Sequence, residues 1–205
     1  MNPEKEKDPI IILKILILGD SGVGKTSILI KYINNKFDES HIATIGVDYM
    51  DKTIKYKNIN VKLQIWDTSG QEKFRSIARN FYRNSDAIFL VFDLNNKDTY
   101  DSIKQWINDV EEHCPNIKKI LLGNKSDLEK NVSEEIIKNF AKENNLQYFE
   151  TSAKNGTNIK EAFKAMVDLL LGGKSEQEIL NGFALHESDL SIASENQTTK
   201  KKKCC

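Results

Sequence analysis

The sequence has few cysteines, no net charge and no apolar run long enough to cross a membrane. Its three cysteines are Cys114 and the distant adjacent pair Cys204 and Cys205, so no disulfide framework is indicated and a reducing, cytosolic setting is expected. The 30 acidic residues balance the 30 basic ones, which excludes a global field that would attract nucleic acid. The strongest apolar run, IIILKILIL at 10–18, is too short to span a bilayer and contains Lys14.

The length of the chain favours one domain with extensions at both ends. At 205 residues and 39% hydrophobic, the chain can fill one core well and is short for two. We expect an N-terminal extension over residues 1–9, a domain over 10–171 and a flexible tail over 172–205. The tail is predicted because the sequence after Leu171 is polar, broken by glycines and without a sustained period.

β-like and helix-like segments alternate along the domain, which predicts an α/β fold. The β-like runs are 10–18, 61–66, 87–92, 117–123 and 146–152. The helix-like segments are 26–36, 73–84, 99–112, 133–144 and 158–171. Two β-like runs meet around KNIN at 57–60 with no room for a helix, which predicts an antiparallel hairpin. We therefore expect a mostly parallel, six-stranded sheet with one antiparallel edge strand and helices on both faces.

The stretch GDSGVGKT at 19–26 matches the phosphate-loop pattern G-x-x-x-x-G-K-S/T, and it lies between a buried strand and a helix start. Its glycines let backbone N–H groups close around phosphate oxygens, and Lys25 adds a positive charge. The hydroxyl of Thr26 can ligate Mg²⁺. The alternative is a strand-to-helix turn with incidental glycine and lysine. A phosphate loop alone does not distinguish ATP from GTP.

Guanine is indicated by GNKSD at 123–127, at the end of a predicted strand. Asp127 can accept hydrogen bonds from the N1–H and the exocyclic amine of guanine, which adenine does not present in that arrangement. Asn124 and Lys125 would brace the loop and cover the ring, and TSAKNG at 151–156 offers backbone N–H groups to the guanine oxygen. Either motif alone is weak, since N-x-x-D also occurs in Asx turns. Both, in order after a phosphate loop, favour GTP.

A third motif, WDTSGQEKF at 66–74, follows an alternating strand. Asp67 can hold Mg²⁺ through water, Gly70 can bring a backbone N–H near a γ-phosphate, and Gln71 can orient an attacking water. In isolation D-T-S-G is an ordinary tight turn. Beside the other two motifs it predicts a loop that senses the γ-phosphate.

The order GDSGVGKT, TIG, WDTSGQ, GNKSD, TSAK resembles the small Ras-like GTPases. The runs that resemble the Rab branch are IGVDY at 45–49, KLQIWDT at 62–68, QEKFR at 71–75, FYRNSD at 81–86 and LVFDLN at 90–95. The resemblance covers about residues 10–171 and the terminal cysteines. It implies a P-loop NTPase with a Ras-like G domain that hydrolyses GTP slowly to GDP with Mg²⁺ and recruits effectors to membranes in vesicular trafficking.

The resemblance also assigns roles to residues that no local pattern singles out. Phe37 would lie across the guanine edge, and Thr44 would be a Mg²⁺ ligand that reports the γ-phosphate. Ile45, Trp66 and Phe74 resemble the hydrophobic patch that Rab effectors contact, the alternative being ordinary core or half-core residues. The implied metal ligands are Thr26, Thr44 and Asp67, and the implied catalytic residue is Gln71. The implied nucleotide-binding residues are Ser21, Gly22, Val23, Gly24, Lys25, Thr26, Ser27, Phe37, Thr44, Gly70, Asn124, Lys125, Asp127, Ser152, Ala153 and Lys154.

The end of the chain, KKKKCC at 200–205, resembles a double prenylation site, distinct from a C-a-a-X box because no residues follow Cys205. Two lipid chains anchor a protein stably where one binds marginally, and lysines favour an anionic leaflet. Leu190 and Ile192 resemble the apolar pair that Rab escort proteins grip, the alternative being two aliphatic residues without a role in a disordered tail. The alternative is a solubilising lysine cluster with unmodified thiols at Cys204 and Cys205.

The implied partners are an exchange factor, a GTPase-activating protein, a GDP-dissociation inhibitor or escort protein, and effectors. We expect a monomer that binds no nucleic acid and that cycles between the cytosol and the cytosolic face of intracellular membranes.

Three residues depart from the Rab pattern near the γ-phosphate. Ser69 stands where most Rabs have alanine, Ala43 where they have serine and His41 where they have an aromatic residue. These departures bear on the hydrolysis rate more than on the nucleotide. They leave open a non-hydrolysing nucleotide-binding scaffold, which the retained Gln71 opposes. A second alternative, an ATP-dependent P-loop kinase, is disfavoured by Asp127 and by the lack of an arginine-rich lid.

Overall fold

A computed structural model describes residues 10–39, 44, 46–70 and 75–182. The strands are β1 (Ile10–Leu18), β2 (Val47–Tyr56), β3 (Ile59–Thr68), β4 (Ala87–Asp93), β5 (Lys118–Asn124) and β6 (Gln147–Glu150). The helices are α1 (Lys25–Asn34), α2 (Arg75–Tyr82), α3 (Lys97–Asp101), α4 (Ile103–His113), α5 (Glu134–Glu143) and α6 (Ile159–Leu171).

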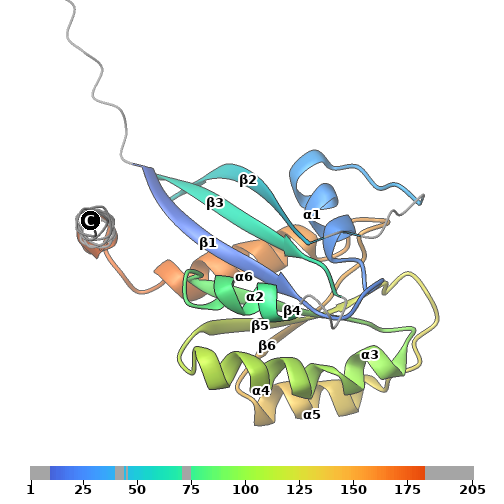
Figure 1. The fold of residues 1–205 in the computed structure, drawn as a ribbon. Coiled ribbons are helices and arrows are strands. Elements are labelled where there is room, and N and C mark those ends of the chain that lie inside the picture. The colour runs from blue at the N-terminus through green and yellow to red at the C-terminus, as the bar shows by residue number, and fades with distance from the viewer. Residues whose placement is uncertain (1–9, 40–43, 45, 71–74, 183–205) are drawn as a thin grey trace, which may run out of the picture.

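Among the described residues, six strands form one sheet in the order β2-β3-β1-β4-β5-β6 (Figure 1). β2 pairs antiparallel with β3, and each of the other neighbouring pairs is parallel. The hairpin turns at Lys57, whose φ of 53° is in the left-handed region expected of such a tight turn. The predicted mostly parallel sheet with an antiparallel edge strand is confirmed.

The central strands are apolar on both faces because helices cover both sides of the sheet. In β1, Leu13, Ile15 and Ile17 belong to one core cluster, while Leu16 and Leu18 belong to the other. This alternation follows from the two-residue period of a strand. It accounts for the continuous apolar run, in which the strand is buried on both sides.

The helices divide between the two clusters. Buried side chains of α1 and α6 enter the cluster that contains Leu13, and buried side chains of α4 and α5 enter the cluster that contains Leu16. Figure 1 shows α3, α4 and α5 on one side of the sheet and α1 on the other. This arrangement leaves the carboxyl ends of the parallel strands at one edge of the molecule, where loops can gather.

The structure differs from the sequence interpretation in two places. The segment predicted as one helix over 99–112 is two helices, α3 and α4, that meet at Ser102. The side chain of Asn96 accepts a hydrogen bond from the backbone N–H of Asp98 and caps α3.

None of the helices among the described residues combines the length and the apolar composition needed to cross a bilayer.

The second difference is at the start of the predicted tail. Residues 176–182 are helical, and Ile179 is buried in the cluster with α1 and α6. Two hydrogen bonds tie this segment to the β2–β3 turn: the ammonium of Lys57 donates to the carbonyl of Lys174, and the amide of Asn58 donates to Glu176. The prediction of a flexible tail from residue 172 is therefore wrong as far as 182, because one buried isoleucine and these contacts hold a segment that has no long apolar period. Residues 183–205 lie outside the described residues.

We expect Ile179→Ala to lower the free energy of unfolding by about 2 kcal/mol or more, because it removes a buried aliphatic side chain and leaves a cavity. Gln177→Ala, at an exposed position of the same helical segment, should cost less than about 0.5 kcal/mol. Denaturant unfolding of both variants at one fixed nucleotide concentration measures the difference, since bound ligand shifts apparent stability. Equal losses in the two variants would contradict the packing role of Ile179.

Candidate functional site

The site begins where β1 ends and the chain turns into α1. Gly24 precedes the helix with φ 94°, and no side chain of the described residues caps its first turn. Gly24, Lys25 and Thr26 at this helix start line a pocket, and N–H groups at such a position bind phosphate in phosphate-binding loops. A Cβ at Gly24 would lie 2.4 Å from the amide nitrogen of Asn124, so only glycine fits there.

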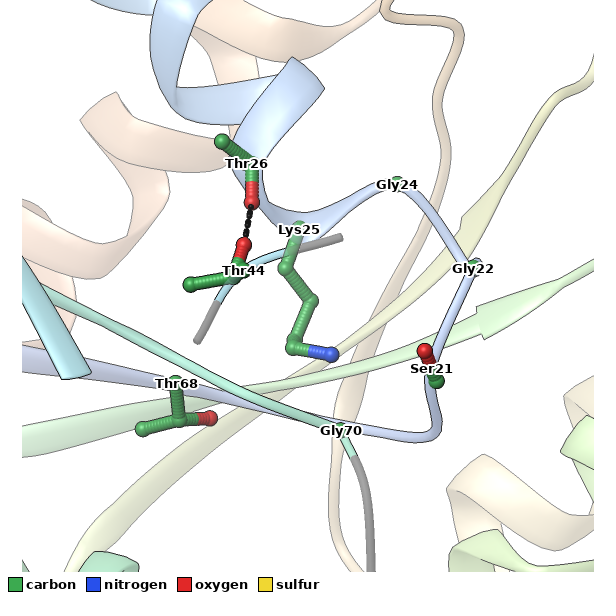
Figure 2. A pocket seen from close by; sticks show the side chains of 8 residues that line it. All are labelled: Ser21, Gly22, Gly24, Lys25, Thr26, Thr44, Thr68 and Gly70. Atoms are coloured by element: carbon green, nitrogen blue, oxygen red, sulfur yellow. Dashed lines mark hydrogen bonds between the residues drawn. The ribbon is translucent and has the colours of Figure 1, made fainter. Parts of the chain in front are cut away.

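Lys25 is buried inside this loop. Its ammonium donates hydrogen bonds to the backbone carbonyls of Gly19 and Asp20, each at 2.8 Å. Figure 2 shows the side chain directed into the space between the loop and Gly70. Burial lowers the pKa of Lys25 to about 8, although the negative charges of Asp67 and Asp20 oppose that shift. The loop thus holds a buried cation ready for an anion.

Three oxygen-bearing side chains meet beside Lys25, although they come from three separate segments. The hydroxyl of Thr26 lies 2.5 Å from Oδ2 of Asp67 and 2.7 Å from the hydroxyl of Thr44 (Figure 2). The Thr44 hydroxyl is 3.4 Å from the same carboxylate oxygen. The three residues that the sequence suggested as metal ligands are therefore brought together.

One of the two carboxylate oxygens of Asp67 is left without a partner among the described residues. This oxygen is Oδ1, and it is buried. Burial raises the pKa of Asp67 above its ordinary value, and the hydrogen bond from Thr26 and the charge of Lys25 offset this in part. A buried carboxylate oxygen without a partner is costly, so the arrangement favours a cation that would complete it.

The pocket has a volume of about 230 Å³ and is lined by Ser21, Gly22, Gly24, Lys25, Thr26, Thr44, Thr68 and Gly70. A Cβ at Gly70 would lie 2.2 Å from the carbonyl carbon of Asp20, so the backbone of the third motif lies directly against the backbone of the phosphate loop.

Thr68 lines the pocket although it was not predicted as a site residue. Its hydroxyl donates to the carbonyl of Ile17, and its place within the DTSG turn is the only sequence signal that could have suggested it.

The guanine motif lies against the phosphate loop at the ends of β5 and β6. The buried side-chain amide of Asn124 donates to the carbonyl of Val23 at 2.8 Å, which joins two segments 101 residues apart. The hydroxyl of Ser152 donates to Oδ1 of Asp127 at 2.5 Å, and the N–H of Ser126 donates to the carbonyl of Thr151. The two motifs predicted to bind guanine, at 123–127 and 151–156, are thus joined by hydrogen bonds into one unit.

Lys125 has an unusual backbone within that unit. Its φ of 63° is in the left-handed region, which non-glycine residues adopt at an energetic cost. Its ammonium pairs with Asp93 at 2.7 Å, at the end of β4. The pair fixes the ammonium end of Lys125 beside the end of β4.

Some predicted residues are placed apart from these contacts. Phe37 is exposed, and Lys154 is exposed and pairs with Glu39 at 3.2 Å. Ser27 is half-buried in α1, and Ala153 is buried. The departure Ser69 is buried, and its N–H donates to the carbonyl of Gly46. The predicted residues Gln71, Ile45, Phe74, Cys204 and Cys205, and the departures His41 and Ala43, lie outside the described residues.

Trp66 is half-buried on β3 between two other aromatic rings. The rings of Tyr49 and Phe81 each lie 5.0 Å from it. Of these three aromatic residues, only Trp66 was predicted, although Tyr49 and Phe81 lie within the runs IGVDY and FYRNSD that carried the resemblance. The register of β2 on β3 sets Tyr49 opposite Trp66, and only the fold brings Phe81, from α2, to the same ring.

A parallel α/β sheet with a phosphate loop after β1 and oxygen ligands at the ends of neighbouring strands defines a P-loop nucleotide-binding protein. Comparison with known proteins narrows the class. The profile of the Ras family matches residues 14–171.

The chain is 41% identical to "Ras-related protein Rab-15" of Bos taurus over 191 residues, which cover 91% of this chain and 90% of that protein. It is 43% identical over 169 residues to "GTP-binding protein YPTM2" of Zea mays, with 81% of each chain covered, and to "Ras-related protein Rab-1D" of Dictyostelium discoideum to the same extent.

The chain therefore belongs to the Ras family, in its Rab branch. It is a small GTPase that binds guanine nucleotides, hydrolyses GTP, acts as a switch in vesicle trafficking and works through effectors and regulators. Neither the non-hydrolysing scaffold nor the ATP-dependent kinase is favoured by these relatives.

Proposed function

We propose that this GTPase uses Mg²⁺ held by Thr26, Thr44 and Asp67, and that the same oxygens report which nucleotide is bound. The observation that carries the proposal is the buried Oδ1 of Asp67, which lacks a partner among the described residues and lies in a carboxylate already in contact with two hydroxyls. Hydroxyl and carboxylate oxygens are the ligands Mg²⁺ prefers, directly or through water. Bound there, Mg²⁺ would neutralise negative charge on the phosphates.

The phosphates themselves would be bound by the loop and Lys25. Two of the three N–H donors of the Lys25 ammonium bind the carbonyls of Gly19 and Asp20. These two bonds fix the direction of the third N–H, which would donate to a phosphate oxygen. The N–H groups of residues 21–26 at the start of α1 would surround the phosphate oxygens. Contacts within the protein already fix the Lys25 ammonium, so little of its ordering cost would fall on binding.

The switch would depend on two positions that line the same pocket from separate segments. Thr44 precedes β2 and Gly70 follows β3, and both lie beside Lys25. A γ-phosphate would interact with both, and hydrolysis would release them, because the contact that holds each segment is lost with the phosphate. Gln71, next to Gly70, would orient the attacking water.

The aromatic set Tyr49, Trp66 and Phe81 would serve as part of the surface that effectors contact, with Ile45 and Phe74 from the flanking segments. Tyr49 and Trp66 lie on the two strands that begin after Thr44 and end before Gly70. Their position therefore depends on the segments that the γ-phosphate would hold. Half-buried aromatic side chains are frequent anchors of protein interfaces.

Guanine would be selected by Asp127, whose carboxylate is oriented by Ser152. We expect Asp127→Asn to weaken GTP binding by about 100-fold, because a charged acceptor of two hydrogen bonds is lost, and to favour xanthine nucleotides. Competition of GTP, ATP and xanthosine triphosphate for a fluorescent nucleotide measures this. Equal affinity of the unmodified protein for ATP and GTP would contradict the proposed role of Asp127.

Hydrolysis would depend on Gln71 more than on Ser69. We expect Gln71→Leu to lower the single-turnover rate of GTP hydrolysis with little loss of GTP affinity, because the glutamine acts on the attacking water. Ser69→Ala is the matched variant two residues away and should change the rate less. An unchanged rate in Gln71→Leu, with and without an activating protein, would contradict the proposal.

The C-terminal cysteines would attach the switch to a membrane. Cys204 and Cys205 follow four lysines, so two isoprenoid chains and a basic cluster would act together on the cytosolic face of an intracellular membrane. Leu190 and Ile192 would dock the tail on an escort protein before modification. Exchange factors, activating proteins and a GDP-dissociation inhibitor would then set the cycle between membrane and cytosol.

We expect the combined change Cys204→Ser and Cys205→Ser to move the protein from the membrane fraction to the cytosolic fraction, because both lipid sites are lost. Intact-mass measurement of the unmodified sequence from its native cell should show two isoprenoid additions. Leu190→Ser with Ile192→Ser should slow the modification and leave GTP binding unchanged. A membrane-bound protein with an unmodified C-terminus would rule out lipid anchoring.

A further inference from the structure

A hydrogen bond joins the phosphate loop to a helix that does not contact the pocket. The indole N–H of Trp106, in α4, donates to Oδ1 of Asp20 at 2.8 Å across 86 residues of sequence. Asp20 is the second residue of the phosphate loop, and its side chain does not line the pocket. The bond therefore acts on the loop from outside the site.

The backbone of Asp20 has two contacts on which the site depends. Its carbonyl oxygen accepts one of the hydrogen bonds that hold the Lys25 ammonium. A Cβ added to Gly70 would lie 2.2 Å from the carbonyl carbon of Asp20, so the backbone of the third motif packs directly against the backbone of Asp20. A small displacement of Asp20 would move Lys25 and would collide with Gly70, or open a gap beside it.

The other end of the bond is firmly held. Trp106 is 1% exposed and packs in the core cluster with Leu16 and Leu18 of β1. One turn further along α4, Asp109 accepts a hydrogen bond from Tyr82 at 2.8 Å and pairs with Arg79, both of α2. The helix can therefore serve as a fixed support for the loop.

We propose that Trp106 and Asp20 are positioning residues for phosphate binding: their hydrogen bond fixes the loop so that the Asp20 carbonyl aims Lys25 and leaves the space that Gly70 occupies. The proposal rests on the use of this loop for the phosphates of the nucleotide. Neither side chain needs to touch the ligand, because each acts through the backbone of Asp20.

The negative charge of Asp20 and its hydrogen bond to Trp106 have opposite expected effects on the rate of nucleotide release, so substitutions can separate them. A carboxylate close to a phosphate site repels the phosphates, and its removal alone would slow the release of nucleotide. Loss of the hydrogen bond would free the loop and speed release. Asp20→Asn removes the charge and keeps an oxygen that can accept from the indole, whereas Asp20→Ala removes both.

The experiment measures the rate at which full-length protein loaded with a fluorescent GDP analogue releases it into excess GDP in the presence of Mg²⁺. We expect Asp20→Ala and Trp106→Phe each to release it about tenfold faster, the size typical for a lost hydrogen bond to a charged group. The double variant should also be about tenfold faster and not about a hundredfold, since both changes remove one shared bond. Asp20→Asn should release it no faster than the unmodified protein.

Tyr82→Phe is the control, because it removes another hydrogen bond from an aromatic side chain to a carboxylate on the same helix and leaves the loop untouched. It should lower the unfolding temperature and leave the release rate unchanged. Multiplying effects in the double variant, or fast release by Asp20→Asn, would overturn the positioning role. Failure of the unmodified protein to retain GDP would overturn the proposed function as well, whereas normal retention with unchanged variant rates would overturn this inference alone.

Discussion

Every part of the site depends on how closely the phosphate loop packs against its neighbours. There is no room for a side chain between Gly24 and Asn124, or between Gly70 and Asp20. In both places the approach of the segments sets the shape of the pocket, so the glycines are needed for space as much as for backbone freedom. These close approaches restrict the positions that the loop can adopt, so phosphate binding can use groups that the protein itself holds in place.

The site holds two buried charges that are incompletely satisfied, Lys25 in the phosphate loop and Asp67 at the end of β3. Burial lowers the pKa of Lys25 and raises the pKa of Asp67, so each charged form is less stable there than in water. They attract each other, yet the ammonium is bound to carbonyls and one carboxylate oxygen has no partner among the described residues. A bound polyphosphate and a cation would supply the missing opposite charges. A ligand that supplies them would therefore interact strongly with the site, and such an interaction can control the conformation of adjoining segments.

Helices and strands outside the pocket hold these groups at fixed positions. The helix α4 contacts the phosphate loop through Trp106, and it contacts α2 through Asp109. One helix therefore supports both the phosphate loop and the segment after the third motif. β2 and β3 carry Tyr49 and Trp66 on adjacent strands whose ends adjoin Thr44 and Gly70. A displacement of Thr44 or Gly70 would therefore act on this aromatic surface through the strand that adjoins each of them.

The sequence alone determined the fold class, the phosphate loop and the guanine motif. Each depends on neighbouring residues, either through the hydrophobic periodicity of strands and helices or through the residue spacing of a motif. The sequence placed Asp67 at the end of one strand, Asp127 just after another, and Lys25 and Thr26 in the loop that leads from a third strand into a helix, and the parallel sheet then requires those strand ends to meet. Tertiary structure alone decided what joins residues far apart: the 86 residues between Asp20 and Trp106 and the 101 between Val23 and Asn124 leave no local pattern. It also decided that the domain continues to residue 182, because the burial of Ile179 depends on a surface that α1 and α6 create only after the chain has folded.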